Sequence, residues 1–93
     1  MRWSAVPADA LAWRQFEDEI VVRNARTAST HHLEGLSAEV LRALIEVGGP
    51  VTVDELAARL GLEGDNAADQ WRGAIQEVLR EFDRVGLAEP VAG

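Results

Sequence analysis

The sequence predicts one α+β domain in which three short antiparallel strands precede three helices and a brief final strand. Strand-forming residues gather before position 34, and residues with the spacing of amphipathic helices follow as far as about position 85. The connections between the strands are short, which favours an antiparallel meander. Because 93 residues suit one domain, we expect residues 1–93 to form a single unit.

Three segments have the composition of strands. Leu11–Phe16 alternates apolar with polar or small residues, and Glu19–Arg23 is rich in β-branched residues. The small, polar residues 24–28 (NARTA) suit a hairpin loop. The chain then returns as a third strand, Ser29–Leu33, and turns into a helix after Glu34-Gly35.

The helices are marked by capping residues. Ser37 is predicted to cap the first helix, which residues 48–50 (GGP) end. Thr52 and Glu55 have the spacing of a capping box at the start of the second helix. Gly86 is predicted to end the third helix at about Val85.

The third helix has an unusually broad apolar stripe. A stripe of this width indicates a helix that touches more than one neighbour. We expect the tail after Gly86 to pair with an early extended segment, Arg2–Ala5. The stripe comprises Trp71, Ala74, Ile75, Val78, Leu79 and Phe82.

Charge and composition exclude several classes of function. The net charge is −7 and all nine basic residues are scattered arginines, so a nucleic-acid partner is disfavoured. No apolar run approaches the ~20 residues that span a bilayer, so we expect no membrane partner. The absence of cysteine fits a reducing cytoplasm and predicts neither disulfides nor thiolate metal sites.

The adjacent histidines His31 and His32 do not predict a metal site. Neighbouring residues on a strand point to opposite faces, so the two rings are poorly placed to share one ion. The sequence also contains no recognisable nucleophile with a base and an orienting group, and no phosphate-binding glycine loop. We therefore expect no metal, no cofactor and no catalysis.

The second and third helices have the spacing of a helix-turn-helix, and the back half of the chain looks like a winged-helix domain. This arrangement leaves a DNA-binding transcription regulator as an alternative function. In that case the third helix would enter the major groove and read bases with residues such as Gln70 and Arg72.

The chain resembles the PqqD family of small peptide chaperones, also called RiPP recognition elements. The resemblance is carried by THHLEGLS, SAEVLRALIEVGG, TVDELAARL and VGLAEP, and it covers essentially the whole chain. The segments MRW and VVRNARTASTHHL are most similar to the HPr-rel-A branch of that family. This resemblance implies a non-catalytic adaptor that presents a precursor's leader peptide to a modifying enzyme, with a protein resembling HPr kinase as a further partner.

The resemblance also implies where the peptide binds. An uncovered strand edge is a ready surface for an added strand, and the family's groove lies between the third strand and the third helix. Trp71 fits either the core or this groove, and self-pairing through the same edge, giving a homodimer, stays open as an alternative. The implied peptide-binding residues are Ser29, Thr30, His31, His32, Leu33, Trp71, Arg72, Ile75, Val78, Leu79 and Phe82.

Overall fold

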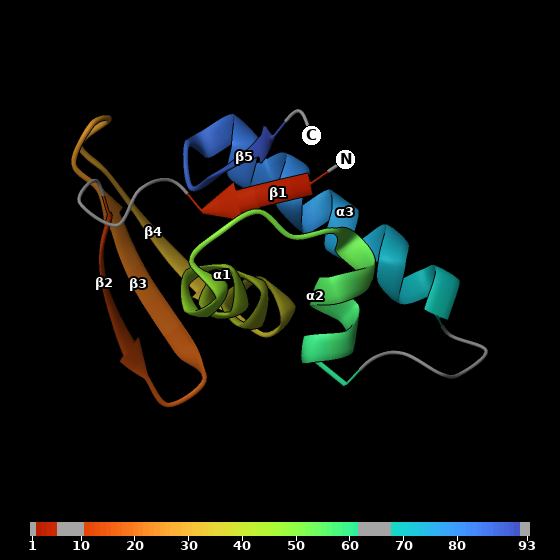
Figure 1. Cartoon of the computed structure of the whole chain (residues 1–93). Coiled ribbons are helices and arrows are strands. Elements are labelled where there is room, and N and C mark those ends of the chain that lie inside the picture. The colour runs from red at the N-terminus through yellow and green to blue at the C-terminus, as the bar shows by residue number, and fades with distance from the viewer. Residues whose placement is uncertain (1, 6–10, 62–67, 92–93) are drawn as a thin grey trace.

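The computed structural model describes residues 2–5, 11–61 and 68–91. It confirms the predicted α+β fold, with a three-stranded antiparallel sheet, three helices and a short C-terminal strand. Helix α1 lies between this sheet and α2, while α3 runs beside the β1–β5 ribbon (Figure 1). The elements are β1 (Arg2–Ala5), β2 (Leu11–Phe16), β3 (Glu19–Asn24), β4 (Ser29–Glu34), α1 (Leu36–Val47), α2 (Val53–Arg59), α3 (Ala68–Val85) and β5 (Ala88–Val91).

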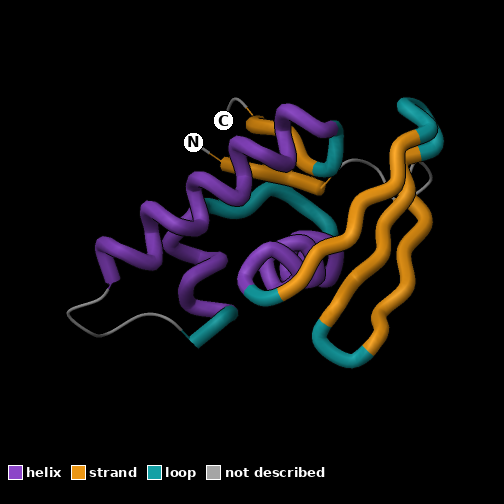
Figure 2. Tube along the Cα trace, turned by 180° about the vertical axis from the view of Figure 1, so that it is seen from behind, coloured by secondary structure: helices purple, strands orange, loops and turns teal. Residues whose placement is uncertain are grey.

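The larger sheet has the strand order β2-β3-β4, and its register fixes which side chains share a face. Val22 lies opposite both Trp13 on β2 and His31 on β4. Ile20 and Val22 are fully buried on the face toward α1, while the alternate residues point outward. Within the described residues, β4 therefore ends the sheet on the side nearest α3 (Figure 2).

The smaller sheet joins the two ends of the described chain. Strands β1 and β5 pair antiparallel, from Arg2 opposite Val91 to Ala5 opposite Ala88, which confirms the predicted pairing. Trp3 adds a bridge on the other side of β1, because its N–H donates to the carbonyl of Val51 at 2.7 Å. This ribbon covers the core at the end of the molecule away from the β2–β3 turn.

Helix α1 begins one residue after Gly35, so the prediction that Ser37 is its N-cap was wrong. Gly35 has φ 61° and ψ −134°, and no side chain caps the helix. This left-handed φ lets the chain turn directly from β4 into the helix, where Glu39 N–H donates to the carbonyl of Gly35 at 3.2 Å. Ser37 consequently lies within the first turn.

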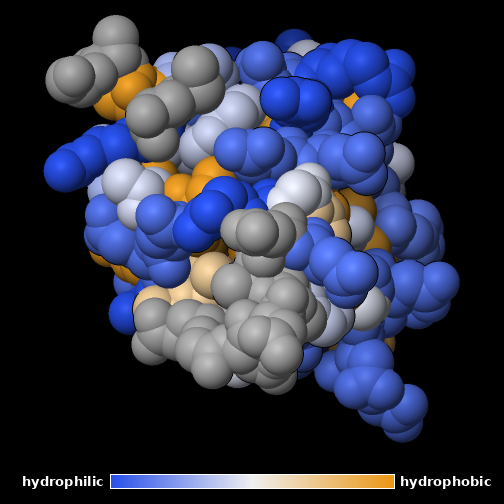
Figure 3. All heavy atoms as spheres, turned by 90° about the vertical axis from the view of Figure 1, so that its right-hand side faces the viewer, coloured by the Kyte–Doolittle hydropathy of each residue, from blue (hydrophilic) through white to orange (hydrophobic). Residues whose placement is uncertain are grey.

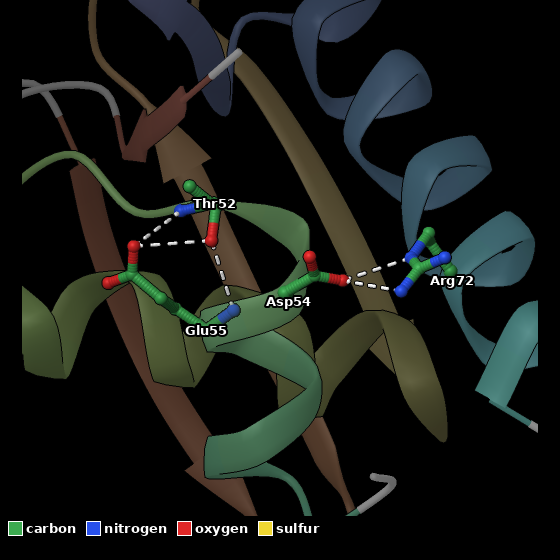
Figure 4. Close-up of polar contacts among 4 residues, drawn as sticks. All are labelled: Thr52, Asp54, Glu55 and Arg72. Atoms are coloured by element: carbon green, nitrogen blue, oxygen red, sulfur yellow. Dashed lines mark hydrogen bonds and ion pairs between the residues drawn. The ribbon is translucent and has the colours of Figure 1, made fainter.

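The capping box of α2 is confirmed. The Thr52 hydroxyl accepts a hydrogen bond from the Glu55 backbone N–H at 3.1 Å. The Glu55 carboxylate accepts one from the Thr52 backbone N–H at 3.4 Å (Figure 4). Two backbone donors at the helix start are satisfied in this way. The predicted end of α3 is confirmed as well, since Gly86 has φ 83°.

The core lies where α1, α2 and α3 meet the inner face of the larger sheet and the ribbon. On the side of the molecule that carries α2 and α3, by contrast, the visible surface is mainly hydrophilic (Figure 3). The largest fully buried apolar side chains are Phe82, Ile20, Leu41, Leu44, Leu56, Ile75, Leu79, Leu87, Val22 and Val40.

Asn24 ends β3 instead of opening the hairpin loop, and it is only 2% exposed. Its Nδ2 donates to the carbonyl of Gly86 at 2.6 Å, and its Oδ1 accepts from the Arg26 backbone N–H at 2.8 Å. One side chain therefore joins β3 to the corner between α3 and β5.

Replacing Asn24 with alanine is expected to lower the free energy of unfolding by about 1–3 kcal/mol, because the Gly86 carbonyl loses a hydrogen-bond donor inside the protein. Chemical denaturation of the two proteins measures the difference. Thr27→Ala is the matched control in the same hairpin, since Thr27 is exposed. Equal stabilities of Asn24→Ala and Thr27→Ala would contradict the assigned role.

Candidate functional site

Strand β4 presents an open edge beside α3. Ser29, His31 and Leu33 are half-buried on its inner face, and the residues between them are exposed. In an antiparallel strand, every second residue directs its N–H and C=O away from its one neighbour. An edge of six residues therefore offers several backbone donors and acceptors to an added strand.

The two histidines of β4 face opposite sides of the sheet, as predicted. The His31 Nε2 lies 3.0 Å from the Ser29 hydroxyl oxygen on the inner face. The His32 Nδ1 lies 2.9 Å from a carboxylate oxygen of Glu19 on the outer face. Across the described ranges, no group of three or more His, Cys, Asp or Glu residues is placed to hold a metal ion.

Helix α3 approaches β4 through the side that carries Glu81. A hydrogen bond from Arg84 chiefly lowers the pKa of the Glu81 carboxyl, and the charge of His31 lowers it slightly further. In Figure 2, β4 is the strand of the larger sheet that lies on the side of α3. Sequence patterning missed Glu81, although it lies three residues after Val78 on a neighbouring line of the helix.

The residues of α3 divide among three sides of the helix. Ile75, Leu79 and Phe82 point into the core and are at most 2% exposed. At 100° per residue, Trp71 and Val78 lie close together on the margin between this core side and Glu81. Trp71 is 38% exposed and Val78 is partly buried, so this margin of α3 is only partly covered by the core.

Arg72 lies on the other margin of α3 and reaches α2. Both its Nε and one terminal nitrogen lie 2.9 Å from a carboxylate oxygen of Asp54 (Figure 4). This ion pair is partly exposed, so its contribution to stability is modest. It orients Arg72 away from the β4 edge.

The predicted site residues therefore fall into distinct groups. The β4 residues lie on the open edge of the sheet and Trp71 and Val78 lie on one margin of α3, whereas three of the apolar predictions belong to the core. The alternative that placed Trp71 in the core is not supported, since more than a third of the residue is exposed. We refer to the space between β4 and this margin of α3 as the β4–α3 groove.

A polar hollow of about 590 Å³ lies where β4 passes into α1. Its rim is acidic, because four carboxylates meet the single guanidinium of Arg42 there. The end of β4 that passes into α1 is therefore surrounded by more negative than positive charge. The hollow is lined by Gln15, Glu17, Asp18, Ile20, Glu34, Gly35, Ala38, Glu39 and Arg42.

None of the described helices is long and apolar enough to cross a membrane. No known family model matches the chain, and no curated protein matches it by sequence. Among solved structures, the chain is similar to TbiB1 in complex with the TbiA(beta) leader peptide, with a TM-score of 0.76 and 18% identity. The match covers 97% of this chain and 99% of that one. Over nearly its full length, the chain therefore has the fold of a protein whose structure was solved with a leader peptide.

Proposed function

We propose that this protein is a non-catalytic adaptor that binds the leader segment of a ribosomally synthesised precursor peptide and presents it to a modifying enzyme. The observation that carries the proposal is the open edge of β4, together with the exposure of Trp71 on α3. The shared fold with TbiB1, which was solved with a leader peptide, supports it.

In the proposed mode of binding, the leader adds a strand to β4. Outward-facing N–H and C=O groups of Ser29–Leu33 exchange hydrogen bonds with the leader's backbone, which supplies affinity without requiring particular side chains. Successive side chains of a strand point to opposite faces. Alternate leader side chains then enter the β4–α3 groove, where Trp71 and Val78 offer apolar surface and determine specificity.

In this mode of binding, the other predicted residues of α3 do not contact the leader but hold the helix in place. Ile75, Leu79 and Phe82 hold α3 on the core and so set the position of the groove wall. Arg72 braces α3 against α2 through Asp54.

The enzyme partner is the most specific part of the proposal. The sequence resemblance to PqqD family chaperones, in particular to the HPr-rel-A branch, suggests a cytoplasmic system that includes a protein resembling HPr kinase. A non-catalytic role suits this setting, since the chemistry then belongs to the enzyme that receives the leader.

The DNA-binding alternative is disfavoured by the chain's own charges. The net charge of −7 opposes binding to a phosphate backbone. Arg72, which base reading would require, is engaged with Asp54. We predict no salt-sensitive binding to duplex DNA near physiological ionic strength.

The proposal is tested by titrating the ¹⁵N-labelled domain with the leader of a precursor peptide encoded near its gene. Backbone amide signals of Ser29–Leu33 and of α3 are expected to shift, whereas a scrambled leader leaves them in place. Unchanged spectra with every precursor peptide encoded nearby would refute the function.

Trp71→Ala is expected to weaken leader binding about 30-fold, which corresponds to the ~2 kcal/mol typical of an interface hot spot. The fold is expected to persist because Trp71 is 38% exposed. Isothermal titration calorimetry measures the affinity. Gln76→Ala is the control on the same helix, since Gln76 is exposed and lines a hollow shared with Asp54 on α2. Equal losses in both variants would argue against a groove contact by Trp71.

A further inference from the structure

The outer face of the three-stranded sheet, turned away from α1, carries an exposed apolar patch among its polar residues. Phe16 is 55% exposed there, which makes it the most exposed large apolar residue in the described part of the chain. Val21 and Ala12 share this face, while Trp13, which the register places on the inner face, is 39% exposed at the sheet's edge and reaches the rim of the same depression. A contiguous exposed apolar patch marks an interaction surface more often than a scattered apolar residue does.

This face is hollowed as well as apolar. A shallow depression of about 360 Å³ lies over β2 and β3 and extends to β4. The depression is large enough to receive one or two side chains of a partner. It is lined by Ala12, Trp13, Arg14, Phe16, Val21, Arg23 and Thr30.

Two arginines flank the apolar centre of the depression. Arg14 lies opposite Val21 on the neighbouring strand, and Arg23 lies between Ala12 and Thr30. Within the described residues, neither guanidinium group has a hydrogen bond or an ion pair. By contrast, Arg42, Arg59, Arg72 and Arg84 all have carboxylate partners.

We propose that this outer face is a docking surface for a second protein, which presents an apolar side chain flanked by carboxylates. A guanidinium binds a carboxylate through paired hydrogen bonds, and both arginines are available for such contacts. Aromatic residues and arginine are also the residue types that dominate the energetic centres of interfaces. The surface goes beyond the proposed leader site, because its centre lies over β2 and β3 on the outer face of the sheet, and Thr30 is the one lining residue that the two surfaces share.

A second copy of this chain does not fit the same face. Symmetric pairing places the same patch on both partners, so the arginines of both copies would be gathered in one interface. The net charge of −7 on each copy adds further repulsion. Charge complementarity at the patch therefore favours a different protein with local acidic groups.

The test uses the intact chain and each purified protein encoded by the genes beside its own. We expect one of these proteins to bind, and the double variant Arg14→Glu/Arg23→Glu to weaken that binding at least about 30-fold. The control, Arg2→Glu/Arg80→Glu, makes the same change in net charge elsewhere and is expected to bind normally. Leader-peptide affinity is expected to stay unchanged in both double variants.

Phe16→Ala provides an independent variant, with an expected loss of about tenfold. Since Phe16 is more than half exposed, the thermal midpoint is expected to stay close to that of the wild type. The proposal is overturned if no neighbouring protein binds at micromolar concentrations, or if the two double variants bind equally well. Sedimentation that shows a dimer abolished by Phe16→Ala would also overturn it, because the occupant would then be a second copy.

Discussion

Proline at one of the two adjacent positions His31 and His32 is expected to abolish leader binding while the domain stays folded. Successive residues of a strand direct their N–H groups to opposite sides, so one of these two faces β3 and the other faces the open edge. Proline lacks the N–H and is tolerated on an edge strand where that group points to solvent. Calorimetry with the leader peptide measures the binding.

Proline at the other of these two positions is expected to destabilise the domain. It removes a hydrogen bond between β3 and β4, and we expect a loss of stability of about 1–3 kcal/mol from the unpaired carbonyl. The matched alanine variants, His31→Ala and His32→Ala, keep both N–H groups and are expected to bind the leader nearly normally. If both proline variants fold and bind, strand addition at β4 is refuted.

Phe82→Ala is expected to have the largest effect on stability among single substitutions on α3. Phe82 is 2% exposed, and truncating a buried phenylalanine costs about 3–5 kcal/mol. A domain of this size has roughly 5–14 kcal/mol in total, so the variant approaches the limit of folding. Urea denaturation followed by circular dichroism measures the loss.

Glu77→Ala is the control for this measurement, because Glu77 is exposed on the same helix and its replacement is expected to change stability by less than about 0.5 kcal/mol. The comparison distinguishes a residue that holds α3 on the core from a residue that contacts the peptide. A Phe82→Ala protein of wild-type stability that has lost leader binding would show that Phe82 contacts the peptide directly.

Local patterns predicted most of the fold. The β-branched run of β3, the Thr52–Glu55 capping box and the glycine at position 86 each depend on neighbours a few residues away, and the structure confirms them. The pairing of β1 with β5 was predicted from the winged-helix pattern of the back half of the chain. These elements are the ones whose physical cause is contained in a short window.

The incorrect or missing predictions have causes outside such a window. Ser37 is a good cap by type, but the left-handed turn at Gly35 starts the helix before it. Asparagine is a common loop residue, but the burial of Asn24 depends on its hydrogen bond to the carbonyl of Gly86, 62 positions away.

The apolar stripe of α3 also depends on distant parts of the chain, which limits what its sequence predicts about the candidate site. Its spacing identifies one broad apolar face without saying which part of that face meets the core. Burial of Ile75 and exposure of Trp71 depend on where α1, α2 and β5 pack against α3, which the helix period alone does not encode. The stripe therefore predicted an apolar face of α3 but not which of its residues are buried and which are exposed.

The β1–β5 ribbon has a consequence for how the protein folds during synthesis. Residues 2–5 pair with residues 88–91, so the ribbon closes a loop that spans almost the whole described chain. Closing so long a loop comes at a high entropic cost, and such contacts form slowly. The hairpins β2–β3 and β3–β4 pair within a few residues, and they can form while the chain is still leaving the ribosome. Trp3 can reach its final position in the core only after β5 has left the ribosome.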